Sequence, residues 1–135
     1  MIPPTGPAAS PIRVLVADDD PSFRSSVCDL IERQPGFEVV ATAADGLRAI
    51  ELTDDVDPDA VVLDVHMPLL DGVSTAARLR RDHPSLCLIA LTGDDEPALH
   101  EAVREAGADE VLLKNQLLDA LVERLKNLRS DGEQA

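Results

Sequence analysis

The chain has 135 residues and an apolar content of 44%, which suits one compact domain, and with only two aromatic residues its core must be aliphatic. Its formal net charge of −14 lacks the basic footprint of a nucleic-acid-binding domain, so we expect no direct contact with DNA or RNA. The first residues lack a signal-peptide pattern and no later segment is apolar enough to cross a membrane, so we expect a cytoplasmic protein without membrane contact.

The predicted elements alternate between strand and helix after a proline-rich segment, residues 1–11, that we expect to be disordered. Aliphatic runs predict five short strands at residues 12–17, 37–41, 60–64, 86–91 and 111–113. Each strand is followed by a helix, and the helices are expected to start at Asp20-Pro21, Asp45-Gly46, Asp71-Gly72, Asp95-Glu96-Pro97 and Asn115. The alternation predicts one α/β domain, residues 12–129, with a polar tail from 130 to 135. Its fold is expected to be a three-layer, doubly wound one, with a parallel five-stranded sheet covered on both faces.

Helical spacing also predicts which side chains face the core. Phe23 lies on the apolar side of the first helix, and Leu47 and Ile50 lie on that of the second. The last helix is expected to present an apolar face from residue 117 to residue 128. Cys28 and Cys87 have no metal-binding spacing, and we expect two buried thiols in a reducing compartment.

The central strand of this pattern is the aliphatic run 60–63, which leads directly into Asp64. Turn-forming residues bound it, at 57–59 before the strand and at 67–68 after it. Such a run indicates a buried parallel strand, with Asp64 at its carboxyl end, the edge at which ligands bind in open α/β sheets. An aspartate in this position, taken alone, is more often a loop starter or a helix cap.

Asp64 does not stand alone, because polar side chains end four of the five predicted strands. Asp18 and Asp19 follow the first strand, Asp64 ends the third, Thr92 the fourth and Lys114 the fifth. Since parallel strands bring their carboxyl ends to one edge, these side chains are expected to converge. Each of them, considered separately, is an ordinary solvated loop residue.

The chemistry of the converging groups points toward phosphoryl transfer. Three neighbouring carboxylates repel one another, and a hard cation such as Mg²⁺, which favours carboxylate, water and phosphate oxygens, relieves that repulsion. A lysine ammonium attracts phosphate, and an aspartate carboxylate can attack phosphorus to give an aspartyl phosphate. The sequence contains neither a GxxxxGK[ST] loop nor a GxGxxG motif, so nucleotide binding has no support.

Taken in order, these segments resemble the receiver domain of two-component response regulators. The resemblance spans about residues 12–128 and depends on Val16-Ala17-Asp18-Asp19-Asp20-Pro21, Leu63-Asp64-Val65-His66-Met67-Pro68 with Asp71-Gly72, Leu91-Thr92-Gly93 and Leu113-Lys114. The Leu-Leu-Lys-Asn sequence that ends at residue 115 is similar to the LuxR/NarL-type group. This family implies a flavodoxin-like, CheY-like fold with the sheet order 2-1-3-4-5.

The resemblance also implies a role for each residue that matches the family motifs. Asp64 corresponds to the phosphoacceptor. Asp19 corresponds to the direct Mg²⁺ ligand, Asp18 to the acid that holds the ion largely through water, and the backbone carbonyl of His66 to the remaining protein ligand.

Two further residues match the parts of the family that respond to the phosphoryl group. Thr92 corresponds to the hydroxyl that turns toward it, and Lys114 to the cation that pairs with its oxygens. The chain departs from many receivers at Val111, where an aromatic residue is common, and at Asn115, where proline is common. We therefore expect a switch without a swinging aromatic ring, and a trans peptide before Asn115.

The family further implies partners rather than substrates. The phosphoryl donor is expected to be a sensor histidine kinase or a phosphotransfer protein, and the chain is not expected to catalyse more than its own phosphorylation and dephosphorylation. An output domain or effector would bind the face formed by 97–106, 111–113 and 117–128. The oligomeric state is expected to be a monomer or a phosphorylation-dependent dimer.

Two other function classes stay open on the sequence. The first is a pseudo-receiver, a protein-interaction domain that works without phosphorylation, although the intact polar set argues against it. The second is a flavin-binding electron carrier, which shares the chain order but normally uses aromatic side chains and a phosphate loop that are absent here. The sequence also fits both a stand-alone receiver and the first part of a longer regulator.

Overall fold

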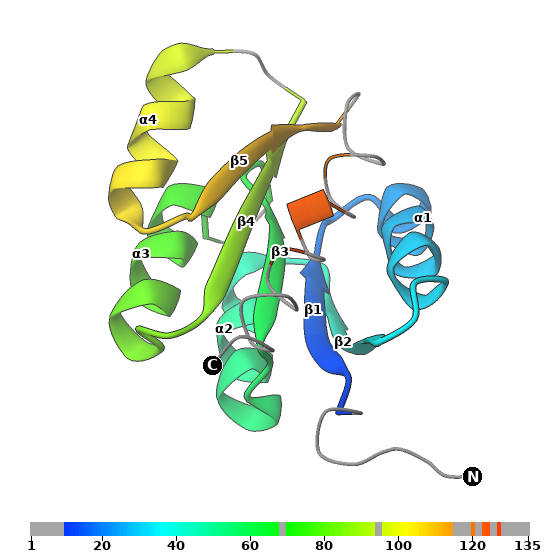
Figure 1. The fold of residues 1–135 in the computed structure, drawn as a ribbon. Helices are drawn as coiled ribbons and strands as arrows, with labels where there is room; N and C mark the ends of the chain where they lie inside the picture. Colours follow the sequence, from blue (N-terminus) through cyan, green and yellow to red (C-terminus); the bar gives the residue numbers. More distant parts are fainter. Residues whose placement is uncertain are drawn as a thin grey trace, which may run out of the picture.

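The structure, a computed structural model, describes residues 10–67, 70–93 and 96–114 and four further positions, 120, 123, 124 and 127. Over these residues strands and helices alternate along the chain (Figure 1). The elements in order are β1 (Ile12–Ala17), α1 (Pro21–Glu32), β2 (Phe37–Ala43), α2 (Gly46–Val56), β3 (Ala60–Asp64), α3 (Gly72–Asp82), β4 (Cys87–Thr92), α4 (Pro97–Ala106) and β5 (Glu110–Leu113).

The strands form one parallel sheet in the order β2-β1-β3-β4-β5, which confirms the expected doubly wound topology. β3 lies at the centre of the sheet, and all five of its residues are buried. A central parallel strand is covered on both faces, which is why its sequence is a continuous apolar run rather than an alternating one. Its only charged residue, Asp64, is the last one of the strand.

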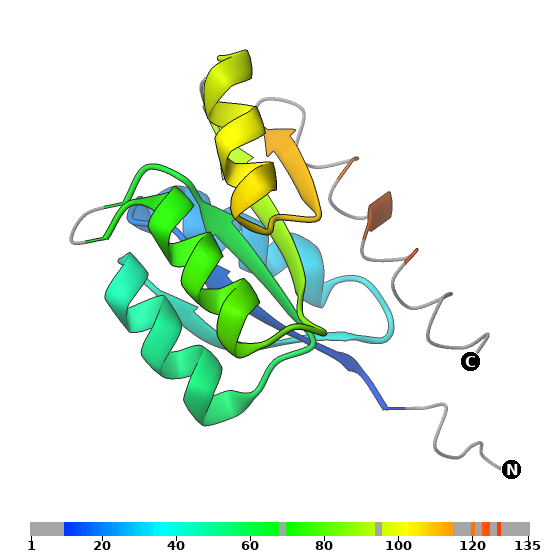
Figure 2. The ribbon, with the colours of Figure 1, turned by 90° about the vertical axis from the view of Figure 1, so that its left-hand side faces the viewer.

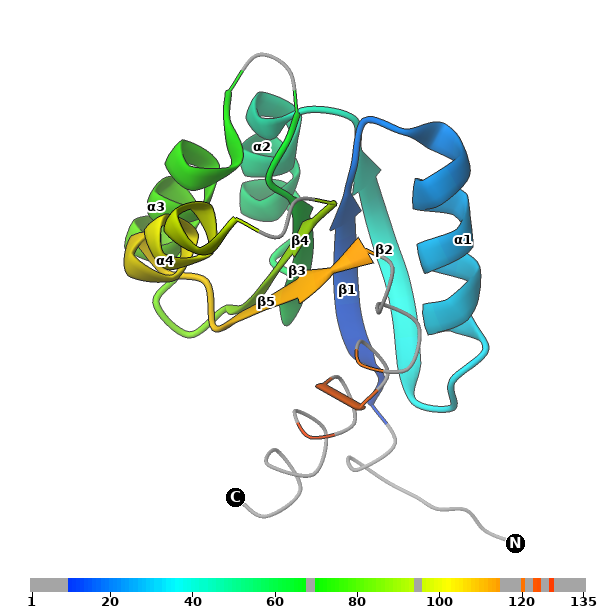
Figure 3. The ribbon, with the colours of Figure 1, turned by 90° about the horizontal axis from the view of Figure 1, so that it is seen from above.

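The described helices cover both faces of the sheet (Figures 1 and 3). α2, α3 and α4 pack side by side on one face, and α1 packs on the other (Figure 2). Alternate residues of β1 divide between the two cores, with Leu15 on the α2–α4 side and Val14 and Val16 on the α1 side. The side chains that fill both cores are predominantly aliphatic, as the composition predicted.

Aspartates begin three of the four described helices, as their spacing predicted. Asp20, Asp45 and Asp71 each accept a hydrogen bond from a backbone N–H in the first turn of α1, α2 and α3. α4 differs, because its N-cap residue Glu96 makes no such side-chain bond. The start of α4 therefore lacks the side-chain cap bond that α1, α2 and α3 have.

Several details differ from the sequence predictions. β4 lies one residue later than predicted, at Cys87–Thr92, and β5 begins one residue earlier, at Glu110. β2 extends two residues further, to Ala43. Leu47 is half exposed rather than buried, because the inward positions of α2 are Gly46, Ala49, Ile50 and Thr53, and Leu47 falls one position outside that stripe. Cys28 and Cys87 are only partly buried, although burial still raises the pKa of Cys87 to about 11 and so disfavours its thiolate form.

Several predictions lie outside the described residues. These are the disordered tail up to residue 9, the cap at Asn115 with the peptide before it, and most of the apolar face between 117 and 128. The four described positions beyond 114 are helical. Among the described helices, none combines the length and the apolar character that are needed to cross a bilayer.

Candidate functional site

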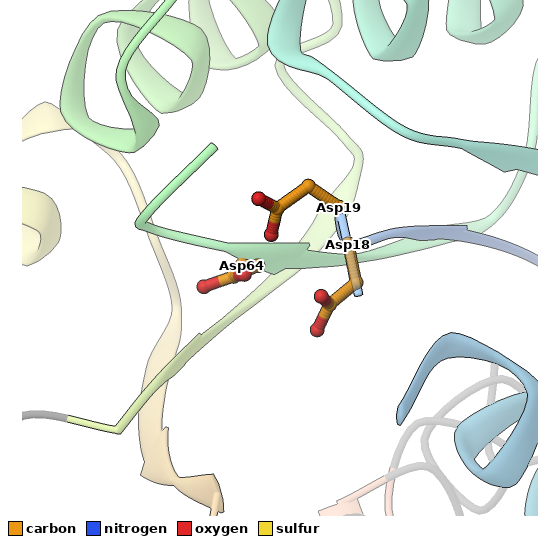
Figure 4. Close-up of side chains that lie close together, drawn as sticks. All are labelled: Asp18, Asp19 and Asp64. Carbon is orange, nitrogen blue, oxygen red and sulfur yellow. The ribbon is translucent and has the colours of Figure 1, made fainter. Parts of the chain in front are cut away.

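The carboxyl ends of β1 and β3 place three aspartates together at one edge of the sheet (Figure 4). The two strands are hydrogen-bonded neighbours in a register that pairs Ala17 with Leu63. The next residues along each strand are Asp18 and Asp64, and Asp19 follows. Carboxylate oxygens of all three aspartates lie within 4.8 Å of one another. The expected convergence of these three side chains is therefore present.

Two of the three carboxylates are taken out of water. Asp18 and Asp64 are 1% and 2% exposed, whereas Asp19 is exposed at the mouth of the site. Burial raises the pKa of Asp64, and the charge of Asp18 raises it further. The His66 N–H, which donates to Asp64 Oδ1 at 3.0 Å, and the Lys114 ammonium lower it only in part. The folded site thus disfavours a full set of ionised carboxylates unless a cation balances them.

Lys114 supplies the one described cation that contacts the buried carboxylates. It follows β5, and its Nζ lies 3.0 Å from Asp18 Oδ2 and 3.2 Å from Asp64 Oδ2. Burial lowers the pKa of Lys114, but its interactions with the two carboxylates prevail and hold the pKa above its ordinary value. A single charged ammonium leaves the three ionised carboxylates with an excess of negative charge.

Asp18 is fixed through its backbone and through one of its two carboxylate oxygens. The Asp20 N–H donates to Asp18 Oδ1 at 2.9 Å, and the Arg24 guanidinium donates to the Asp18 carbonyl at 2.8 Å. Oδ2 is buried and, among the described residues, accepts no hydrogen bond of good geometry, although it is paired with the Lys114 ammonium at 3.0 Å. A buried oxygen without a hydrogen bond, beside two further carboxylates, fits a hard cation such as Mg²⁺.

Thr92 ends β4 at the same edge of the sheet. Asp64 pairs in register with Leu91, so Thr92 lies one residue beyond the register partner of Asp64, and it is fully buried. Gly93, the next residue, is exposed, and a Cβ there would meet no atom of the described residues within 4 Å. Among the described residues, none therefore blocks the approach of a group to the backbone at Gly93.

Gly72 has a different role, which the sequence motif did not reveal. A Cβ on Gly72 would lie 2.3 Å from the Cα of Val65, and the Gly72 N–H donates to the Val65 carbonyl at 3.1 Å. The start of α3 thus lies directly against the backbone that follows Asp64. Any larger residue at this position would displace the loop that orients the Asp64 carboxylate.

Sequence reasoning also missed two residues of the first turn of α1. Phe23 was predicted as a core residue, and Arg24 was assigned no role. The structure places the centroid of the Phe23 ring 4.5 Å from Lys114 Nζ, and it places the Arg24 guanidinium on the backbone of Asp18. Helical periodicity could not have found these contacts, because both reach side chains or backbone from other elements.

Comparison with known proteins agrees with this geometry. A protein-family model described as "Response regulator receiver domain" matches residues 14–126. The chain is 40% identical over 120 residues to the nitrate/nitrite response regulator protein NarP of Escherichia coli, a match that covers 89% of this chain and 56% of NarP. It is 33% identical over 121 residues to the transcriptional regulatory protein DegU of Brevibacillus brevis, covering 90% and 51% of the two chains. The chain spans about half the length of these relatives.

Solved structures match the fold in the same way. A two-component response regulator of the LuxR family from Aurantimonas superposes with a TM-score of 0.84 at 30% identity, over 90% of this chain and 87% of the other. The signal receiver domain of the putative response regulator NarL from Mycobacterium tuberculosis superposes with a TM-score of 0.78 at 32% identity, over 87% and 98%. The second match shows that a domain of this length has been determined as a separate unit.

Proposed function

Since this chain belongs to the family of response regulator receiver domains, which act in two-component signalling, we propose that it accepts a phosphoryl group on Asp64 from a histidine kinase or a phosphotransfer protein. The observation that carries the proposal is the environment of Asp64. Its buried carboxylate lies at the carboxyl edge of the sheet, within 4.8 Å of two further aspartates and 3.2 Å from a lysine ammonium.

In the proposed reaction a carboxylate oxygen of Asp64 attacks the phosphorus of the donor. A P–O bond forms to Asp64, the bond between phosphorus and the donor breaks, and the donor leaves with that electron pair. The His66 N–H at Asp64 Oδ1 fixes the orientation of the attacking carboxylate. Lys114, already beside Oδ2, would pair with phosphoryl oxygens, and the Thr92 hydroxyl would donate to one of them.

The metal site that we propose uses the same edge. Asp18, Asp19, Asp64 and the backbone carbonyl of His66 would hold Mg²⁺. When bound, the ion supplies positive charge that offsets the crowded carboxylates and the incoming phosphoryl group. Two observations support this assignment: three carboxylates lie within 4.8 Å of one another beside the Lys114 ammonium, and burial together with the charge of Asp18 raises the pKa of Asp64.

The output surface is proposed to lie on α4 and β5 together with residues 117–128, most of which are outside the described part of the chain. Val111 in β5 is buried and β-branched, so it has little freedom to rotate. We propose that the switch is a displacement around Thr92 and the start of α4. The partner of this surface is proposed to be an output domain or an effector protein in the cytoplasm, and the relatives named above, which are about twice as long, include a transcriptional regulatory protein.

The test is phosphorylation by a small acyl-phosphate donor with Mg²⁺, followed by the mass of the intact protein. We expect one phosphoryl adduct on the wild-type chain and none on Asp64→Asn. Asp29→Asn, which alters an exposed aspartate of α1, is the matched control and should be modified like the wild type. An adduct that survives Asp64→Asn, or no adduct on the wild type, would contradict the proposal and favour an interaction domain that works without phosphorylation.

A further inference from the structure

The first turn of α1 contacts the site lysine through an aromatic ring. The centroid of the Phe23 ring lies 4.5 Å from Lys114 Nζ, within the range of a cation–π interaction. Among the described residues, the ammonium therefore has three close neighbours: Asp18 Oδ2 at 3.0 Å, Asp64 Oδ2 at 3.2 Å and the face of the ring. Phe23 is one of only two aromatic residues in the chain.

The ring belongs to a closed circuit of contacts around the site. The Asp20 N–H donates to Asp18 Oδ1 at 2.9 Å, and Asp20 Oδ1 in turn accepts the Phe23 N–H at 3.3 Å. The Phe23 ring contacts the Lys114 ammonium, which returns to Asp18 through Oδ2. Asp20, which caps α1, thus connects the backbone of Phe23 to the carboxylate of Asp18, which also contacts Lys114.

The Lys114 side chain needs such a contact to hold its ammonium in one position. Its side chain is a flexible four-carbon stem with a point charge, and it is 23% exposed, so bulk water competes for the ammonium. An aliphatic side chain at position 23 would fill the same core space. Only an aromatic face offers negative charge density to the ammonium without adding another carboxylate to a site that already has three.

We propose that Phe23 is a positioning residue of this site. Its ring holds the Lys114 ammonium over Asp18 and Asp64, and it keeps the ammonium in place when negative charge moves onto a phosphoryl group at Asp64. The inference rests on the proposed function for its effect on phosphorylation. The contact itself does not depend on that function.

The alternative is that Phe23 only fills the core, since it packs against the apolar cluster beneath α1. Three variants separate the two roles. Phe23→Leu retains apolar packing and removes the ring, whereas Phe23→Tyr retains the ring. Leu30→Ala is the matched control, because Leu30 is also partly buried on α1 and packs against the same cluster, about two helical turns further along the helix than Phe23.

The first measurement is the chemical shift of the Lys114 ε-methylene protons. A ring face above Nζ shifts these protons upfield. We expect the shift in the wild type and in Phe23→Tyr, its loss in Phe23→Leu, and no change in Leu30→Ala. This measurement needs no phosphoryl donor, so it still tests the positioning if the wild type is not phosphorylated.

The second measurement is the rate constant of phosphorylation by a small acyl-phosphate donor with Mg²⁺. Loss of a cation–π contact of ordinary strength should slow Phe23→Leu by about two- to five-fold, with recovery in Phe23→Tyr. Leu30→Ala should unfold more easily but react at the wild-type rate. The proposal is overturned if Phe23→Leu keeps the upfield shift, or if Leu30→Ala slows the reaction as much as Phe23→Leu does.

Discussion

The two edges of the sheet both contain an ion pair, but the two pairs are built differently. At the amino ends of β4 and β5, Arg80 of α3 donates to the carbonyls of Pro84, Leu86 and Gly107 and to Asp109 Oδ2, with distances of 2.8 to 3.0 Å. The same Asp109 oxygen accepts the Leu88 N–H at 2.8 Å. One cation faces one carboxylate, and each nitrogen of the guanidinium has a partner.

At the carboxyl ends, by contrast, one cation faces three carboxylates. In the described part of the chain, Asp18 Oδ2 receives no hydrogen bond of good geometry, and the pKa of Asp64 is raised by burial and by Asp18. A polar network in which every group has a partner makes a fold more rigid. A network with an excess of one charge favours binding of a ligand that supplies the opposite charge. Arg80 and Asp109 therefore form a structural clamp, whereas the three aspartates with Lys114 form a site for a ligand.

Breaking the clamp should have the largest effect on stability. Arg80→Ala leaves three carbonyls without their side-chain donor and removes the guanidinium from Asp109, which is half exposed and still accepts the Leu88 N–H, and we expect the free energy of unfolding to fall by about 2–4 kcal/mol. Urea denaturation measures this. Arg78→Ala is the control, because Arg78 forms an exposed pair with Asp82 that should contribute less than about 0.5 kcal/mol. Equal losses in the two variants would show that Arg80 is an ordinary surface residue.

Removing a charge from the site should have the opposite effect and increase the free energy of unfolding. The folded-state pKa of Asp64 lies above its unfolded value, so ionisation of Asp64 destabilises the fold as pH rises through the interval between the two values. At neutral pH without Mg²⁺ we therefore expect Asp64→Asn to raise the free energy of unfolding by about 1 kcal/mol. A less stable variant would contradict this view of the site.

Addition of Mg²⁺ should stabilise the folded protein, because the ion balances the charge of the carboxylates. At ten times its dissociation constant, a ligand of the folded state alone stabilises by about 1.4 kcal/mol, and this gain should appear in the wild type. It should be much smaller in Asp19→Ala and Asp64→Asn, which each remove one proposed ligand. Calorimetric titration provides the constants, and wild-type affinity in Asp19→Ala would exclude Asp19 as a ligand.

Asp71, which caps α3 at the same end of the sheet as the site, should have a smaller effect. The Ser74 N–H, which donates to Asp71 Oδ1 at 2.8 Å, lowers the pKa of this exposed carboxyl. Its stabilising contribution is therefore present above the ordinary aspartate pKa and is lost as pH falls through the lowered value. Asp71→Ala should cost about 1 kcal/mol at pH 7, and Asp71→Asn, which retains a capping oxygen, should cost less.

The smallest expected effect is a difference between the two ends of α4 in their response to phosphorylation. Its start has no side-chain cap, while its end at Gly107 is held by Arg80. Phosphorylation should shift the amide resonances of Thr92 and Leu99 and leave those of Gly107 and Asp109 nearly unchanged. In Arg80→Ala the shifts should extend to Gly107. Shifts at neither end of α4 would show that the signal leaves through another face.

The sequence by itself determined the order of the elements and the edge at which the polar residues meet. Continuous apolar runs such as 60–63 are typical of buried parallel strands, and parallel strands must bring their carboxyl ends together. For that reason the convergence of Asp18, Asp19, Asp64 and Lys114 was predictable before any distance was known. The N-caps Asp20, Asp45 and Asp71 were predictable because capping is a local interaction within one turn.

Tertiary structure alone decided which residues support those groups. The exposure of Leu47 depends on the rotation of α2 about its axis, which a helical period leaves uncertain by one position. The contacts of Arg80 with Gly107 and of Phe23 with Lys114 join residues separated by 27 and 91 positions, because helices and strands far apart in the chain pack together. Local patterns predict which groups end the strands, but the packing of whole elements determines what holds them in place.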